Sequence, residues 1–159
     1  MKSRARIAVL VRDPEWRNAG IELPVLRRAA NLALLRGQLA PNAGSLTILL
    51  TDDGQLRALN EKFRGNPVPT NVLSFPSGQA GQNYLGDVAI AYGVSAREAA
   101  AAGKPLNGHV AHLAVHGVLH LLGYDHVTPR EARVMEPLET AILGEMGIPN
   151  PYARDLTAG

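Results

Sequence analysis

The chain has 159 residues, of which 46% are hydrophobic and 19% are charged; this profile is typical of a globular domain and excludes an intrinsically disordered chain. It contains no cysteine, which excludes disulfides, thiolate metal ligands and a cysteine nucleophile. The formal net charge is only +2, but the excess of Lys and Arg over acidic residues in positions 1–40 would attract a polyanion such as RNA, unless it is simply a solvated surface.

The predicted elements alternate between strands and helices in the first half of the chain and are mostly helical in the second half. In chain order they are a strand at 7–11, a helix at 24–36, a strand at 45–51, a helix at 54–63, strands at 71–75 and 87–91, and helices at 94–102, 107–122 and 128–145. We therefore predict an α+β fold in which residues 1–159 form a single domain, with a small mixed sheet of about four strands packed with about five helices.

Short polar residues and glycines mark the ends of these elements. Asp52 or Asp53 is expected to cap the helix that follows it, Asn107 the long helix, and Thr128 the last helix through a capping box. Gly123 is expected to end the long helix. The segments expected to be irregular are the Gly/Pro-containing loop at 64–69, the turn at 77–83 and the extended tail after 149.

No segment has the pattern of a leader or a membrane span. The first apolar run, at 7–11, is too short for the apolar region of a signal peptide. No stretch approaches the ~20 apolar residues that a helix needs to cross a bilayer. We therefore expect a cytoplasmic protein with no membrane partner.

All five histidines of the chain lie between positions 109 and 126. Helical geometry places those at 109, 112, 116 and 120 on one face of the predicted helix at 107–122. The remaining positions of that helix are largely apolar, so it is expected to be buried. Buried imidazoles need partners, which are either hydrogen-bonding groups or a metal ion.

Three of these histidines have the spacing of a metal site. His116 and His120 stand four residues apart, so their side chains meet over one turn, and the break at Gly123 allows His126 to return to the same ion. This plan is similar to the extended zincin motif, and it predicts one divalent ion, zinc, held on a buried helix and the turn after it. The alternative is a set of core histidines bonded to the backbone.

The number of ligands decides what such a site does. Three ligands leave a coordination position for water or substrate, which is the catalytic arrangement. His112 lies one turn before His116, and as a fourth ligand it would make the site closed and structural.

Position 117 separates this site from zinc peptidases, which carry Glu directly after the first helical His as a general base. Here the residue is Gly117, so peptide hydrolysis by that route is not expected. A side chain at this position would crowd either the metal face or a neighbouring strand.

The segment from His116 to His126, HGVLHLLGYDH, resembles the signature of the YbeY family of bacterial metal-dependent endoribonucleases. Other stretches agree with the same family: Leu59-Asn60 followed by Arg64, then PTNVLSFP at 69–76, LGDV at 85–88, and Met135-Glu136 to Glu139. The resemblance spans about residues 45 to 152. Position 71 is Asn where many members have Asp, so no acid–base role is assigned to it.

The resemblance implies a zinc-dependent, single-strand-specific endoribonuclease that acts in 3′-end maturation of small-subunit (16S) ribosomal RNA and in ribosome quality control. It implies one zinc per chain at His116, His120 and His126, which are then also catalytic, and an essential arginine at Arg64. The implied partners are single-stranded and ribosomal RNA, the small ribosomal subunit and its assembly proteins, with no DNA. A metal and an arginine together suit the charge that develops on phosphoryl oxygens, and a loop position lets Arg64 reach a cleft.

Two other functions fit the same residues: a metallohydrolase with a non-RNA substrate, and a ribosome-assembly factor whose metal is mainly structural. Asp125 either orients a ligand histidine, accepts a proton or shapes the turn. Tyr124 either stacks on a base or packs in the core. Ser74 and Phe75 either line the cleft or pack within a strand.

Overall fold

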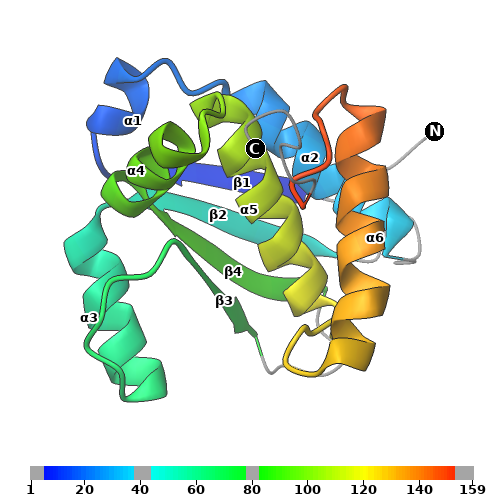
Figure 1. Ribbon diagram of the computed structural model, residues 1–159. Helices are drawn as coiled ribbons and strands as arrows, with labels where there is room; N and C mark the ends of the chain where they lie inside the picture. Colours follow the sequence, from blue (N-terminus) through cyan, green and yellow to red (C-terminus); the bar gives the residue numbers. More distant parts are fainter. Residues whose placement is uncertain (1–5, 38–43, 78–82, 153–159) are drawn as a thin grey trace.

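The computed structural model describes residues 6–37, 44–77 and 83–152. Its four-stranded sheet consists of β1 (Arg6–Val11), β2 (Ser45–Thr51), β3 (Val72–Pro76) and β4 (Tyr84–Ala91). The strand order is β1-β2-β4-β3, with β1, β2 and β4 parallel and β3 antiparallel to β4 (Figure 1). The prediction of a mixed four-stranded sheet in an α+β fold is confirmed. Most of the turn expected at 77–83 lies outside the described residues.

Six helices occur in the described part of the chain, namely α1 (Glu15–Asn18), α2 (Leu23–Arg36), α3 (Asp53–Arg64), α4 (Tyr92–Ala102), α5 (Leu106–Leu121) and α6 (Pro129–Glu145). Five of them match the predicted helices. The additional one, α1, is a single turn, too short to show a helical period in the sequence. Its Trp16 is fully buried and donates its indole N–H to the carbonyl oxygen of Thr51 at 2.9 Å.

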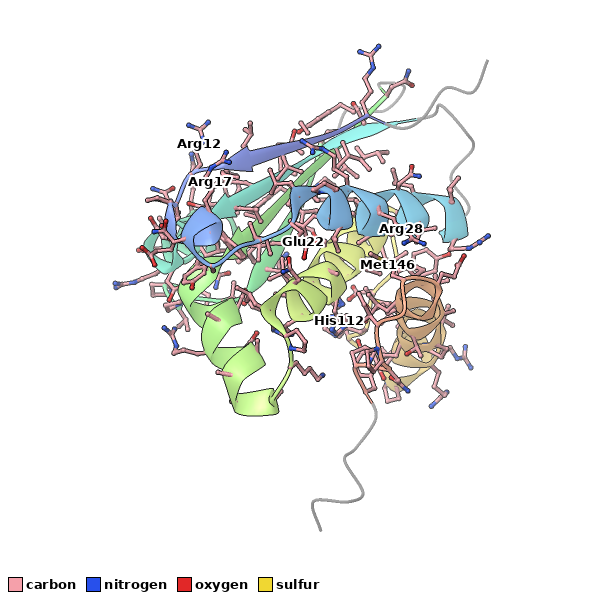
Figure 2. All side chains as sticks on the ribbon, turned by 90° about the horizontal axis from the view of Figure 1, so that it is seen from above. Arg12, Arg17, Glu22, Arg28, His112 and Met146 are labelled. Atoms are coloured by element: carbon pink, nitrogen blue, oxygen red, sulfur yellow. The ribbon has the colours of Figure 1, made fainter. Side chains whose placement is uncertain are left out.

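The helices form unequal layers on the two faces of the sheet. Helices α2 and α5 lie side by side on one face, and α6 packs against both of them (Figures 1 and 2). Helix α3 lies against the other face, near β3 and β4. The main core therefore lies between the sheet and the α2–α5 pair, and a smaller apolar cluster of Leu56, Leu73, Ala89 and Ala91 lies beneath α3. No helix of the described ranges is long and apolar enough to cross a membrane.

The helix ends follow the predicted caps in two cases out of three. Asp52 accepts a hydrogen bond from the backbone N–H of Gln55 at 2.8 Å and caps α3. Thr128 forms the expected capping box at the start of α6. The assignment of Asn107 as a cap is wrong, because α5 begins at Leu106 and the Asn107 side chain instead accepts a tertiary hydrogen bond from the backbone N–H of Glu22.

Gly117 marks the place where α5 approaches the sheet most closely. A Cβ atom there would lie 2.5 Å from Cγ1 of Val88 and 3.2 Å from the hydroxyl oxygen of Ser74. That hydroxyl donates a hydrogen bond to the Gly117 carbonyl oxygen at 2.8 Å. A side chain at position 117 would therefore crowd the neighbouring strands, which was one of the two expected explanations for this glycine. The close approach sets the distance of α5 from β3 and β4.

Substitution of Gly117 by alanine is expected to lower the free energy of unfolding by about 1–3 kcal/mol, because the new methyl group overlaps Val88. Gly144→Ala in α6 is the matched control, since its Cβ would meet nothing within 4 Å. Helix propensity alone should make that variant more stable by about 1 kcal/mol. Denaturant titrations of both variants measure the difference, and an equal or stabilising effect of Gly117→Ala would contradict the close approach.

Candidate metal centre

Helix α5 carries the histidines on one face and buries its other positions. Its fully buried apolar residues are Val110, Ala111, Ala114, Val115, Val118 and Leu119. The imidazoles of His112 and His116 keep 16% and 19% of their side-chain surface accessible, so they line an open site at the margin of the core. This arrangement confirms the predicted buried helix with a histidine face.

Three imidazoles converge at the C-terminal end of this face. The ring nitrogens of His116, His120 and His126 all lie within 4.8 Å of one another. The Nε2 atoms of His116 and His120 are 3.1 Å apart. Two nitrogens bound to one tetrahedral zinc at about 2.0–2.1 Å stand roughly 3.3–3.4 Å apart, so the spacing in the protein is close to that of a shared ion.

The turn after α5 delivers the third imidazole. Gly123 adopts φ +101°, a left-handed conformation that side chains other than glycine rarely take, and it reverses the chain directly after the helix. Asp125 then accepts a hydrogen bond from the backbone N–H of His126 at 2.7 Å. This backbone hydrogen bond is the main cause of the lowered pKa of Asp125. Asp125 thus shapes the turn that places His126.

A buried carboxylate stands behind the cluster. Glu139 of α6 has no accessible surface, and it accepts hydrogen bonds from Nδ1 of His116 at 2.7 Å and Nε2 of His112 at 2.8 Å. The hydroxyl of Tyr152 donates a third, short hydrogen bond to the same carboxylate. Burial alone would favour the neutral acid, but these donors outweigh it and lower the pKa of Glu139 to about 2. Glu139 is therefore a carboxylate near neutral pH.

The charge of Glu139 determines the proton position on His116. A carboxylate only accepts hydrogen bonds, so Nδ1 of His116 carries the proton and Nε2 presents a lone pair to the cluster. Burial, followed by the neighbouring imidazoles of His116 and His126, lowers the pKa of His120 and favours its neutral, ligating form.

These donors fit a divalent cation. A fully buried carboxylate needs a positive partner, and within the described residues the ion pairs of Glu139 are with His112 and His116 only, with no lysine or arginine. A cation at the lone pair of His116 would compensate that charge through the imidazole ring. Three imidazoles, one of them backed by a carboxylate, are also a donor set typical of zinc sites.

The other two histidines lie outside the three-histidine cluster. His112 bonds Glu139 and lies edge-on to Tyr152, so it holds the carboxylate and is not a fourth ligand within the described cluster. His109 bonds the carboxylate of Glu98 at 3.0 Å, and Glu98 in turn accepts from the side-chain amide of Asn71. Asn71 thus has a structural partner and keeps no assigned acid–base role.

The cluster opens into a cavity of about 570 Å³. Its walls come from α3, β3, α5, the turn after α5 and the C-terminal segment, and the lining includes Arg64, Asn71, Ser74, His112, His116, His120, Asp125, His126, Val127 and Tyr152. Segments far apart in the sequence therefore meet at one site. The volume is ample for a nucleotide-sized group next to the imidazoles.

Arg64 reaches this cavity from a helix and not from a loop. It is the last residue of α3, and Gly65 ends the helix in a left-handed conformation at φ +68°. The expected loop position was wrong by one residue, because Gly65 rather than Arg64 terminates the helix. The helical position holds the backbone of Arg64, from which the exposed side chain extends into the cavity. Its positive charge lies close enough to contribute, after burial and the neighbouring imidazoles, to the lowered pKa of His120.

The remaining candidates divide between the cavity and the core. Ser74 lines the cavity, whereas Phe75 points to the opposite face of the sheet and contacts Phe63. Tyr124 packs against the main core, as its packing interpretation predicted. The extended conformation expected for the tail after 149 is wrong for residues 151–152, which form a turn. This turn brings Tyr152 back to His112. Residues 153–159 lie outside the described ranges.

Sequence reasoning did not assign Glu139 and Tyr152 to the site. The sequence did contain a signal for Glu139, because it occupies the apolar face of α6 together with the buried Met135, Ile142 and Leu143. An acid within such an apolar stripe is rarely buried without a partner. Nothing local marks Tyr152.

Some of the basic residues at positions 1–40 form contacts within the fold. Arg36 of α2 forms an ion pair with Glu145 at 2.6 Å, and Arg28 donates to the backbone carbonyl oxygen of the same residue. These contacts tie α2 to the end of α6. In Figure 2, Arg12 and Arg17 lie near the end of β1 and α1, apart from Arg28 on α2.

Comparisons with known proteins find one matching family and several similar chains. The family described as Endoribonuclease YbeY matches residues 23–147. The protein named Endoribonuclease YbeY from Jannaschia sp. is 43% identical over 160 residues, which cover 92% of this chain and 99% of that protein. One of the same name from Rhodopseudomonas palustris is 54% identical over 114 residues, 68% of this chain and 60% of the relative's length. A solution structure of a Thermotoga maritima protein has a TM-score of 0.58 at 20% identity, covering 93% of this chain and 99% of that one, and shows the fold alone.

Proposed function

The chain belongs to the YbeY endoribonuclease family, and from this premise we propose that it is a zinc-dependent endoribonuclease specific for single strands, with one zinc held by His116, His120 and His126. The observation that carries the proposal is the convergence of these three imidazoles in the cavity that also holds Arg64. Three protein ligands leave a position for water or substrate, as in catalytic zinc sites.

The chemistry of phosphodiester cleavage suits this cavity. Negative charge accumulates on the phosphoryl oxygens as the bond breaks, and zinc, when bound, supplies a Lewis acid that stabilises it. The Arg64 guanidinium presents fixed donors to the same oxygens. Because Arg64 is at a helix end, its backbone is held in place before the substrate arrives.

The buried network behind the cluster keeps the ligands in position. Glu139 holds the Nδ1 proton of His116, and Tyr152 and His112 hold Glu139 in turn. Such outer partners orient ligand rings and raise their basicity. Zinc peptidases carry a general base at the position that Gly117 occupies here. Because Gly117 has no side chain, α5 can pack closely against Val88 of β4.

The substrate class proposed for this site is the 3′ end of small-subunit ribosomal RNA, with a role in ribosome quality control. Family membership is what supports this part of the proposal. The proposed partners are the small ribosomal subunit and its assembly proteins, and the proposed location is the cytoplasm. The exposed Arg27 and the other basic residues of the N-terminal region would favour a polyanionic partner.

A chelator assay on purified single-stranded RNA tests the proposal. Removal of the metal is expected to stop cleavage, and one equivalent of zinc is expected to restore it, while duplex RNA of the same sequence stays intact. Cleavage that persists in the metal-free protein would contradict the metal requirement. Hydrolysis of another phosphate ester with no effect on RNA would favour a non-RNA substrate. RNA binding without any cleavage, in a protein that unfolds when the metal is removed, would favour an assembly factor with a structural metal.

A further inference from the structure

Phe63, next to Arg64 at the end of α3, is a large apolar side chain that the fold leaves exposed. Of its surface, 58% is accessible to solvent. The only other phenylalanine of the chain, Phe75 on β3, lies against it, with ring centroids 5.1 Å apart and ring planes inclined at 57°. The contact with Phe75 positions the ring without burying it. Phe63 therefore presents an accessible aromatic surface that keeps one ring contact with Phe75.

Cationic side chains flank this ring in the sequence. The ammonium of Lys62 lies 5.3 Å from the Phe63 ring centroid. Arg64 lines the cavity of the three-histidine cluster. Adjacent helical residues project about 100° apart, so Phe63 and Arg64 face different directions from the same helix end. Lys62, Phe63 and Arg64 are consecutive at the end of α3, so a strand that follows this helix end would meet all three.

Phe63 also lines a second cavity, of about 640 Å³, on the face of the sheet opposite α5. Phe75 lines it too, whereas its neighbour Ser74 points to the metal centre, as expected for alternate residues of a strand. Phe63 thus lines the second cavity, while its chain neighbour Arg64 lines the metal cavity. The second cavity is lined by the carboxylates of Asp52 and Asp87 and by Arg12, so it offers both acceptors and a donor to the polar edge of a base.

We propose that Phe63 is a stacking platform for one base of the RNA whose phosphodiester lies at the metal centre, with Lys62 close to a neighbouring phosphate. This inference rests on the proposed function. An aromatic ring next to cations is the usual composition of grooves that bind single-stranded nucleic acid. A base within a duplex already has both faces covered, so a stacking requirement selects unpaired strands. Phe63 would thereby provide a physical basis for single-strand specificity.

Three substitutions in the full-length, metal-loaded protein test the platform: Phe63→Ala, Phe63→Leu, which keeps apolar bulk without the ring, and Phe63→Trp, which keeps an aromatic surface. Leu35→Ala on α2 is the matched control, because Leu35 is also exposed, at 47%, and lines neither cavity. The probe is a labelled oligouridylate of about ten nucleotides, within the usual site size for such proteins. Affinity is measured by anisotropy, cleavage by gel, and folding by thermal melting.

The alanine and leucine variants are expected to bind the oligouridylate roughly 5-fold or more weakly than the unmodified protein, as for the loss of one stacked base. The loss should appear mainly in KM, with metal content unchanged. The tryptophan variant should keep its affinity, and its emission should be quenched by RNA over the constant background of the buried Trp16.

Unchanged affinity in the leucine variant, or tryptophan emission that RNA does not alter, would overturn the platform while RNA cleavage by the unmodified protein continued. If the unmodified protein neither binds nor cleaves the oligouridylate, the proposed function fails and the platform fails with it. The two failures are therefore distinguishable.

Discussion

Replacement of His120 and His126 together by alanine is expected to reduce bound metal from about one equivalent to near zero and to leave RNA cleavage at background. The two imidazoles provide two of the three nitrogens that lie within 4.8 Å of one another, and one histidine alone binds zinc weakly. Elemental analysis of the purified variant and a cleavage assay on single-stranded RNA provide the two measurements. The melting temperature should fall as well, because metal binding is linked to folding.

His109→Ala is the matched control for that experiment. His109 lies on the same face of α5, but its ring bonds Glu98 and lies outside the three-histidine cluster. This variant should keep its full metal content. Full retention of metal by the double variant would show that the three-histidine site is assigned to the wrong residues.

Arg64→Ala is expected to reduce kcat by about 10² to 10³-fold, which is the usual effect of removing one group that stabilises developing charge. Arg64→Lys should keep part of the activity, because lysine retains the charge but lacks the planar, forked donor set that matches phosphate. A residue that contacts mainly the transition state affects kcat more than KM, so steady-state kinetics on single-stranded RNA are the measurement.

Metal content and thermal stability should be unchanged in both Arg64 variants, because Arg64 is at a helix end and lines an open cavity. Arg97→Ala is the matched control, since Arg97 pairs with Asp53 at the other end of α3 and lines neither the metal cavity nor the second one. Normal cleavage by Arg64→Ala, or a variant that simply unfolds, would remove Arg64 from the active site and leave the three-histidine cluster standing.

The parts of this protein that the sequence determined by itself are those encoded by local spacing. His116 and His120 meet because four residues make about one helical turn, and Gly123 allows the reversal that returns His126. Thr128 caps α6 through the residue three positions later, again a local rule. Short apolar runs, bounded by breakers such as Pro76, likewise predicted all four strands, because these signals are also local.

Only the tertiary structure decided which distant residues complete the site. Glu139 lies 23 residues after His116, and Tyr152 lies 40 residues after His112, yet packing of α6 and the C-terminal turn brings both to the metal centre. Arg64 lines the same cavity from the end of α3. The family resemblance named this arginine, but no spacing along the chain relates it to the histidines.

The tertiary structure also decided why position 117 is a glycine: a side chain there would overlap Val88 on β4. The physical reason is common to these residues. Helical and strand periods depend on neighbours along the chain, whereas contacts between α3, α5, α6 and β4 depend on how complete elements pack around one core. Side chains that meet only after this packing carry no spacing that relates them in the sequence.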